Sequence, residues 1–222
     1  MNKLFAVFGF ALIFAAAPTA FAADEYSVAE QRVFLDQHMS NVTGAGSIEY
    51  LFVQTAAPAD SFEDKVTLSV GAGAIDKRTL AVEYLSGKHH MELPSVEGGT
   101  GNPVLLYFLE HDIRDMHERL GGQQAYFRKR IRLALADGAT VKPVKLSYRG
   151  KQIEGNEVTI EPYANDSLKD RLGQFVGKRY VFILSDAVPG GIYEIRTSTP
   201  AATGATPAPA VSTALKISEG KS

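Results

Sequence analysis

The sequence predicts an α+β fold in which a curved antiparallel sheet carries helices on one face. Stretches where apolar and polar residues alternate lie on both sides of a helical middle, as half-buried strands require. The middle holds two segments with apolar spacings of three and four, which are typical of amphipathic helices. Strands and helices do not alternate regularly along the chain, so a doubly wound parallel sheet is not expected.

The first element predicted after the leader is a helix over residues 27–39. Ser27 and Glu30 have the spacing of a capping box, and Val28, Leu35 and Met39 follow on one helical stripe. The Thr-Gly-Ala-Gly run over residues 43–46 then ends the helix.

Three strands are predicted between residues 48 and 84. Ile48, Tyr50 and Phe52 alternate with other side chains, and the same period of two recurs over residues 65–70 and 80–84. A turn at Ser86-Gly87 leads into an extended segment over residues 88–93. Alternate side chains of that segment, at positions 89, 91 and 93, are expected on one face.

The two central helices have clear ends. Asn102 is a good N-cap and Pro103 suits the first helical position, which predicts a helix over residues 103–120 that stops at Gly121-Gly122. A second helix is predicted over residues 123–136, with its narrow apolar side formed by Phe127, Ile131 and neighbouring residues.

The C-terminal half returns to strands. A hairpin is predicted over residues 144–160, a short helix after Asn165, and a last hairpin from strands 179–185 and 192–197. From Ser198 onward Pro, Ala, Thr, Gly and Ser dominate, so residues 198–222 are predicted to form a disordered tail. A single α+β domain is therefore expected over residues 23–197.

Residues 1–22 are predicted to be a cleavable signal peptide. Lys3 gives a positive start, residues 4–17 are apolar, and Ala20-Phe21-Ala22 fits the signal peptidase pattern. The apolar run is too short to span a membrane, and no later stretch qualifies. An exported chain without cysteine is typical of the bacterial periplasm, so we expect a soluble periplasmic protein with no transmembrane segment after cleavage.

Composition excludes several classes of function. The 222 residues include 23 Lys plus Arg and 25 Asp plus Glu, a formal charge of -2, so no global charge favours nucleic acid. The absence of cysteine excludes disulfides, thiolate nucleophiles and Cys-ligated metals. No Gly-x-Ser-x-Gly elbow occurs and the five histidines lack a triad context, so neither an enzyme nor a cofactor is predicted.

Histidines adjoin methionines at three places in the chain. Imidazole and thioether together suit copper, which makes His89, His90 and Met91 candidate metal ligands. Core packing is the alternative for the sulfur, because Met91 shares an apolar strand face.

One face of the predicted helix 103–120 is polar. His111, Asp115 and Glu118 fall on a narrow stripe that offers ligands for a divalent ion, and equally resembles an ordinary solvated face.

A basic segment lies on the second predicted helix. Arg128, Lys129, Arg130 and Arg132 place four cations within five positions, next to Tyr126. Such a surface suits anionic lipid headgroups at a membrane surface, polyanions, or an acidic partner such as an envelope protein. Pairing with carboxylates of the preceding helix is the alternative.

The tripeptide Phe52-Val53-Gln54 in the first strand gives a family resemblance. Together with the signal, the short amphipathic helix, the meandering strands and the interrupting helices, it resembles the LolA-like group of periplasmic lipoprotein-sorting carriers over roughly residues 23–197. That resemblance implies an incomplete barrel whose concave apolar face, covered by helices, accepts acyl chains. Residues 101–135 and the Val188-Pro189-Gly190-Gly191 turn also resemble proteobacterial secreted proteins without an assigned activity.

These observations predict a non-enzymatic periplasmic carrier or binding module for a hydrophobic lipid or acyl ligand. Tyr50, Phe52, Leu106 and Ile113 are the candidates for lining its cavity. The strand over residues 48–54 has apolar groups on both faces, which suits a cavity or a second layer. A filled core needs no ligand, so an envelope structural or interaction protein and a periplasmic copper-binding protein are the alternatives.

Overall fold

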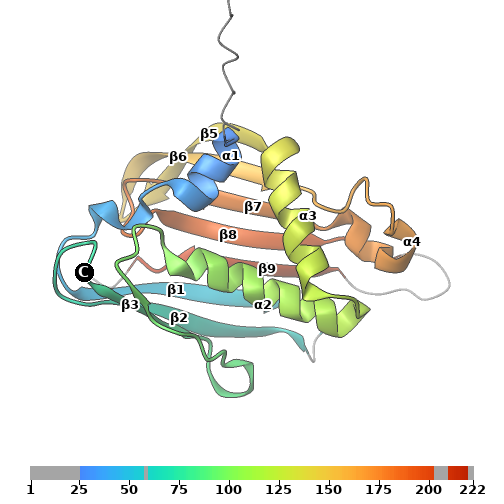
Figure 1. The fold of residues 1–222 in the computed structure, drawn as a ribbon, viewed down its shortest axis with the longest axis horizontal. Coiled ribbons are helices and arrows are strands. Elements are labelled where there is room, and N and C mark those ends of the chain that lie inside the picture. The colour runs from blue at the N-terminus through green and yellow to red at the C-terminus, as the bar shows by residue number, and fades with distance from the viewer. Residues whose placement is uncertain (1–25, 58–59, 203–209, 220–222) are drawn as a thin grey trace, which may run out of the picture.

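The computed structural model describes residues 26–57, 60–202 and 210–219, and shows one curved sheet with helices on one face (Figure 1). Within these ranges the sheet has nine strands, in the order β4-β3-β2-β1-β9-β8-β7-β6-β5. All neighbouring strands are antiparallel. The sheet is not closed into a barrel, because β4 and β5 are its two edges. The predicted α+β class with a curved antiparallel sheet is confirmed.

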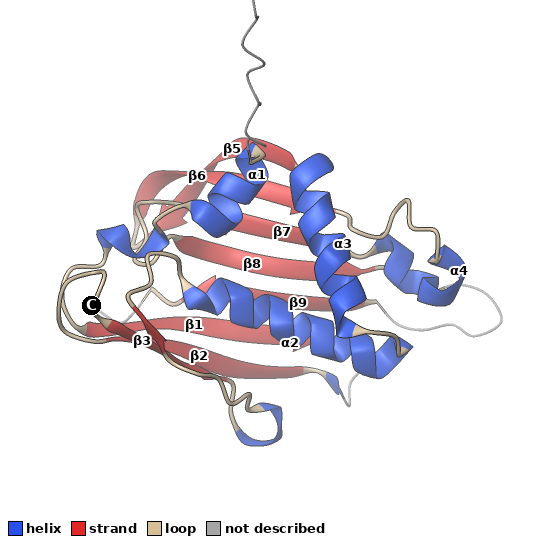
Figure 2. Ribbon diagram, in the orientation of Figure 1, coloured by secondary structure: helices blue, strands red, loops and turns tan. Residues whose placement is uncertain are grey.

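Figure 2 distinguishes the sheet from the helices that cover it. The strands are β1 Gly46–Thr55, β2 Phe62–Val70, β3 Thr79–Tyr84, β4 Val96–Glu97, β5 Thr140–Tyr148, β6 Lys151–Ile160, β7 Arg179–Leu184, β8 Ile192–Thr199 and β9 Val211–Ile217. The helices are α1 Val28–Glu30, α2 Pro103–Leu120, α3 Gln124–Asp137 and α4 Lys169–Leu172. A π-helical turn spans Gln31–Leu35, and 3-10 turns span His38–Asn41, Gly87–His89 and Gly173–Gly177.

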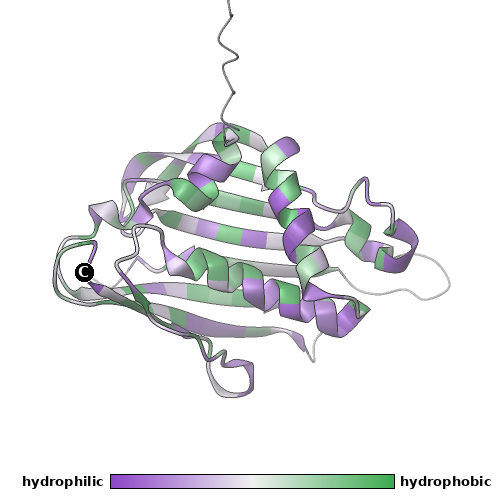
Figure 3. Cartoon of the chain, viewed as in Figure 1, coloured by the Kyte–Doolittle hydropathy of each residue, from purple (hydrophilic) through white to green (hydrophobic). Residues whose placement is uncertain are grey.

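Helices α2 and α3 form where the sequence predicts them. The Asn102 side chain accepts a hydrogen bond from the backbone N–H of Val104 at 3.1 Å, and α2 ends at Gly121, whose φ is 70°. Figure 3 shows hydrophobic and hydrophilic residues along α2, as an amphipathic helix requires. Among the helices of the described ranges, none has the length and hydropathy needed to cross a bilayer.

The N-terminal helix begins as predicted but does not continue unbroken to residue 39. Ser27 and Glu30 form the capping box, with backbone-to-side-chain distances of 3.1 and 3.0 Å. After α1 the chain widens into the π-helical turn, and Asp36 is extended. This break places His38 and Met39 against two glycines of the 188–191 turn, where a Cβ atom would lie within 3.5 Å of their side chains. The chain therefore leaves the regular helical path after residue 35, and the side chains of His38 and Met39 are buried instead.

Residues 88–93 do not form the predicted extended strand. Leu85 and Gly87 both have positive φ, 61° and 53°, and they turn the chain away from the sheet. Met91 makes one isolated bridge to Tyr84, and the neighbour of β3 is the two-residue β4 instead.

The prediction of a disordered tail is wrong for Val211–Ile217. This segment forms β9, which pairs with β1 on one side and β8 on the other. Thr213, Leu215 and Ile217 are buried, so the segment follows the period of two that a half-buried strand requires. Residues 1–22, the predicted signal peptide, lie outside the described residues.

Candidate functional site

The concave face of the sheet is filled by the protein's own side chains. Large rings from both layers meet there and are at most 2% exposed: Tyr50, Phe52, Tyr84, Phe108, Phe127, Tyr163, Tyr180 and Phe182. They form one continuous apolar cluster beneath α2 and α3. The rings on this face of the sheet therefore pack against α2 and α3.

The four residues predicted to line a cavity lie in the packed core or on the solvent side of α2. Tyr50, Phe52 and Ile113 belong to the packed core, with 0%, 0% and 2% exposure. Leu106 is 53% exposed on the solvent side of α2. None of the four lines the hollows described below.

A buried charged group holds α2 on the sheet. The Asp112 carboxylate accepts hydrogen bonds from Lys178 Nζ and Tyr180 Oη, each at 2.6 Å. The charged side chains are 7% and 4% exposed, so water screens the pair weakly. Burial, with the nearby Asp112 charge, raises the pKa of Tyr180 well above its ordinary value, and the phenol stays a donor. This group fixes the position of α2 relative to β7.

A second polar contact holds the start of α2. The Asn102 amide nitrogen donates to Tyr50 Oη at 2.9 Å and to the Gly190 carbonyl at 2.8 Å. Burial raises the pKa of Tyr50, so its hydroxyl stays protonated. The amide nitrogen of Asn102 therefore has two hydrogen-bond acceptors inside the core.

An apolar groove lies at the other end of α2, where it meets α3 and α4. It consists of two adjoining hollows of about 460 and 250 Å³, which share Leu120, Arg171 and Leu172. Phe175 lines the larger hollow and Leu168 the smaller. Leu168 is 41% exposed, so the groove presents apolar surface to solvent.

A polar pocket of about 380 Å³ adjoins the groove. It lies between the β1–β2 connection, the turn after β3, and the outer side of α2. Its lining is Gln54, Asp60, Ser61, Phe62, Lys88, His89, His90, Met91, His111, Arg114, Asp115, Glu118 and Arg119. Asp60 and Arg119 line both this pocket and the larger hollow of the groove. The pocket and the groove therefore lie side by side at the C-terminal end of α2, with Asp60 and Arg119 bordering both.

His111 departs from the solvated face predicted for it. Its ring packs against Phe52 and Tyr84, with centroid distances of 5.3 and 5.6 Å. Burial lowers the pKa of His111 from 6.5, more than the nearby Asp112 and Asp115 raise it. The ring is therefore a neutral, half-buried wall of the polar pocket at neutral pH.

The three candidate copper ligands all line the polar pocket, and each of them makes another contact there. The ring of His89 stacks on Phe62 at 3.8 Å, His90 Nδ1 contacts the Leu85 carbonyl at 3.1 Å, and Met91 is buried in the core. Within the described ranges, no group of three or more His, Asp or Glu side chains is arranged to hold a metal ion.

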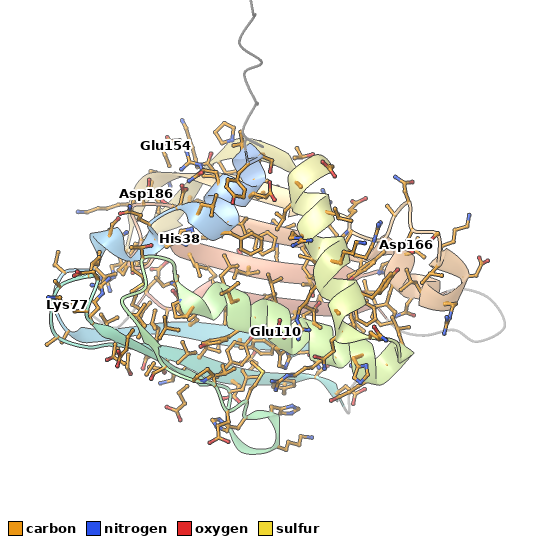
Figure 4. All side chains as sticks on the ribbon, viewed as in Figure 1. His38, Lys77, Glu110, Glu154, Asp166 and Asp186 are labelled. Atoms are coloured by element: carbon orange, nitrogen blue, oxygen red, sulfur yellow. The ribbon has the colours of Figure 1, made fainter. Side chains whose placement is uncertain are left out.

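The basic segment of α3 is divided between paired and unpaired cations. Arg128 makes two hydrogen bonds of 2.7 Å to Glu110, and Arg130 pairs with Asp166 at 2.7 Å. Figure 4 labels both carboxylates, which lie on opposite sides of α3. Lys129 and Arg132 are exposed and make no ion pair with any described residue. Tyr126 is half-buried and lines the smaller hollow of the groove.

Comparison with known proteins identifies no family. No family model matches the chain, and no curated protein matches it in sequence. Among solved structures, the crystal structure of Mycobacterium tuberculosis lipoprotein LppX is similar over 82% of this chain and 90% of that chain, with 9% sequence identity and a TM-score of 0.31. A TM-score of that size establishes neither a common fold nor a common ligand.

Proposed function

We propose that this protein is a non-enzymatic carrier or binding module for a hydrophobic lipid or acyl ligand, and that the apolar groove holds the ligand's chain. The supporting observation is a hollow of about 460 Å³ lined by Leu120, Leu172 and Phe175. That volume lies within the range of small-molecule sites, roughly 300–1,000 Å³. The site proposed from the structure is therefore at the end of α2, whereas the sequence placed it on the concave face.

The larger hollow also has charged side chains of both signs in its lining, Asp60, Arg119, Asp170 and Arg171, which suits a ligand with a polar end. Arg171 lines both hollows and makes no hydrogen bond or ion pair with its side chain among the described residues. A ligand with an apolar chain and a polar end would bury the chain against the leucines and leave its polar end near the arginines. Export to the periplasm remains a prediction from residues 1–22.

Binding of the neutral apolar dye N-phenyl-1-naphthylamine tests this proposal. We expect saturable fluorescence enhancement that lauric acid reverses by competition. The Leu168→Asp variant should bind the dye about tenfold more weakly, because a charge replaces exposed apolar surface that the dye would cover in the smaller hollow of the groove. Leu51→Asp is the matched control, because Leu51 is 47% exposed on the other face of the sheet and outside the groove.

Two results would count against the carrier proposal. One is the lack of saturable enhancement with the unmodified protein. The other is an equal loss of dye binding in Leu168→Asp and Leu51→Asp, because a groove-specific site predicts a difference between them.

An envelope structural or interaction protein is the second candidate, and the filled concave face favours it. The exposed Lys129 and Arg132 would then contact an acidic partner. We expect the double variant Lys129→Glu/Arg132→Glu to lose a partner that Lys145→Glu, on the β5 edge, retains in salt-dependent pull-downs. Equal retention by both variants would remove this candidate.

A further inference from the structure

We infer that the ligand carries a zwitterionic head group, an anionic oxygen group together with an ammonium, and that the polar pocket beside the apolar groove recognises it. This inference rests on the proposed function, because the groove must hold the ligand's chain. Three observations carry it: the adjacency of pocket and groove, the orientation of Arg119, and the balance of charges in the pocket.

Arg119 lies where the polar pocket meets the apolar groove. It lines both hollows, and the next residue in α2, Leu120, lines the groove. A chain that lies along Leu120 and Leu172 therefore ends beside the guanidinium of Arg119. This is the position at which the head group of a single-chain amphiphile would leave the groove.

The guanidinium of Arg119 is oriented but only partly used. Its Nε donates to both oxygens of Asp115, one helical turn earlier, at 2.8 Å each. Its two terminal nitrogens make no hydrogen bond with any described residue. An arginine held in this way presents paired donors to a phosphate or carboxylate without a further loss of side-chain freedom.

The pocket has no net charge with which to attract a simple anion. Its formal cations are Lys88, Arg114 and Arg119, and its carboxylates are Asp60, Asp115 and Glu118. Neutral His111 adds no charge at neutral pH. A head group that carries both signs complements such a lining better than one that carries a single sign.

The pocket still has positive and negative side chains available to a ligand when the Asp115–Arg119 ion pair is taken into account. Asp115 and Arg119 satisfy one another in part, as described above. Arg114 lies near Glu110, whose pKa its charge helps to lower. Glu118 is exposed on α2 and makes no hydrogen bond or ion pair within the described ranges. Glu118 is therefore placed to accept from an ammonium while Arg119 donates to the anionic group.

Isothermal titration calorimetry at pH 8 with three lauroyl compounds tests the inference. Lauroyl lysophosphatidylethanolamine is zwitterionic, lauroyl lysophosphatidylglycerol is anionic, and monolaurin is uncharged. All three share one chain, and each is used below its critical micelle concentration. We expect the ethanolamine lipid to bind at least about tenfold more tightly than the other two.

Variants that remove one charge test which residues cause the preference for the ethanolamine lipid. Glu118→Gln should bring the ethanolamine lipid to the affinity of the glycerol lipid. Arg119→Gln should weaken both phospholipids about tenfold and leave monolaurin unchanged. Glu154→Gln is the control, because Glu154 is exposed on β6 and is absent from the pocket lining. It should behave as the unmodified protein.

The outcomes separate this inference from the proposed function. Equal affinities for all three compounds, or tighter binding of the glycerol lipid, would overturn the zwitterionic inference and leave the groove intact. Loss of the preference in Glu154→Gln as well as in Glu118→Gln would also overturn it. Binding of none of the three compounds would overturn the proposed function, and the inference with it.

Discussion

Removal of one partner from the buried pair beneath α2 should be strongly destabilising. In the variant Lys178→Met, the Asp112 carboxylate keeps the hydrogen bond from Tyr180 but loses its counter-ion in a site where both side chains are less than 10% exposed. An uncompensated buried charge of this kind costs about 3–5 kcal/mol. For a domain of this length that corresponds to a fall in Tm of roughly 6–20 °C.

The double variant Asp112→Asn/Lys178→Met separates the cost of an unpaired charge from the value of the pair. The asparagine oxygen still accepts from Tyr180, and no buried charge remains. We expect the double variant to recover most of the stability lost in Lys178→Met, because neutral replacements of a buried pair are often close to neutral in free energy.

Urea unfolding followed by circular dichroism measures both free energies of unfolding. A loss below about 1 kcal/mol in Lys178→Met would show that water reaches this pair. A double variant no more stable than Lys178→Met would show that the ion pair itself, rather than the orphaned carboxylate, supplies the stability. Either result would contradict the cost assigned to the unpaired, buried Asp112 carboxylate.

Three further predictions follow from individual positions. Burial lowers the pKa of His111 from 6.5, so as the pH falls the unfolded chain binds a proton at this residue before the folded protein does. The free energy of unfolding should therefore fall as the pH drops below about 6.5. Urea titrations at pH 7.5 and 5.5 should show a smaller fall in His111→Phe than in the unmodified protein, and equal falls would contradict this. Gly190 has a φ of 74°, and a Cβ atom there would lie 2.7 Å from Asn102 Nδ2. Gly122 has a φ of 81°, but the space around it is open, so Gly122→Ala should cost only about 1–2 kcal/mol. Gly190→Ala should therefore lower the Tm more than Gly122→Ala does. Leu215→Ala in β9 should cost about 2–5 kcal/mol in chemical unfolding, because Leu215 is fully buried, whereas a change in a disordered tail would have no effect.

Local sequence signals predicted the elements that have their own caps and periods. Asn102, Pro103 and Gly121 fix the ends of α2 by hydrogen bonding and backbone geometry within a few residues, so a single sequence suffices to place them. The same holds for the capping box at Ser27. The break at Asp36 was not predictable in this way, because it depends on burial of His38 and Met39 against a turn about 150 residues away in the chain.

The sequence of β9 has the alternation typical of a strand, but the Pro- and Ala-rich residues before it obscured this pattern. Thr213, Leu215 and Ile217 alternate with Ser212 and Lys216, as a half-buried strand requires. The Pro- and Ala-rich residues before them dominated the composition of the segment. A window of seven residues would have separated the two patterns.

The candidate site was not predictable as a site. The apolar groove joins Leu120 to Leu172, and neither residue is unusual in its local sequence. The polar stripe of α2 was noticed from its spacing, but the packing of His111 on Phe52 and Tyr84 depends on where α2 lies on the sheet. Such positions are set by tertiary packing, which single-sequence periodicity does not contain.

A crystal structure of the protein with lauroyl lysophosphatidylethanolamine would show whether the apolar groove holds an acyl chain. We predict density for the chain along Leu120 and Leu172, with the phosphate beside Arg119 and the core rings unmoved. A chain inserted between α2 and the sheet, with Phe108 displaced, would contradict this prediction, and so would a saturated crystal with no density in the apolar groove.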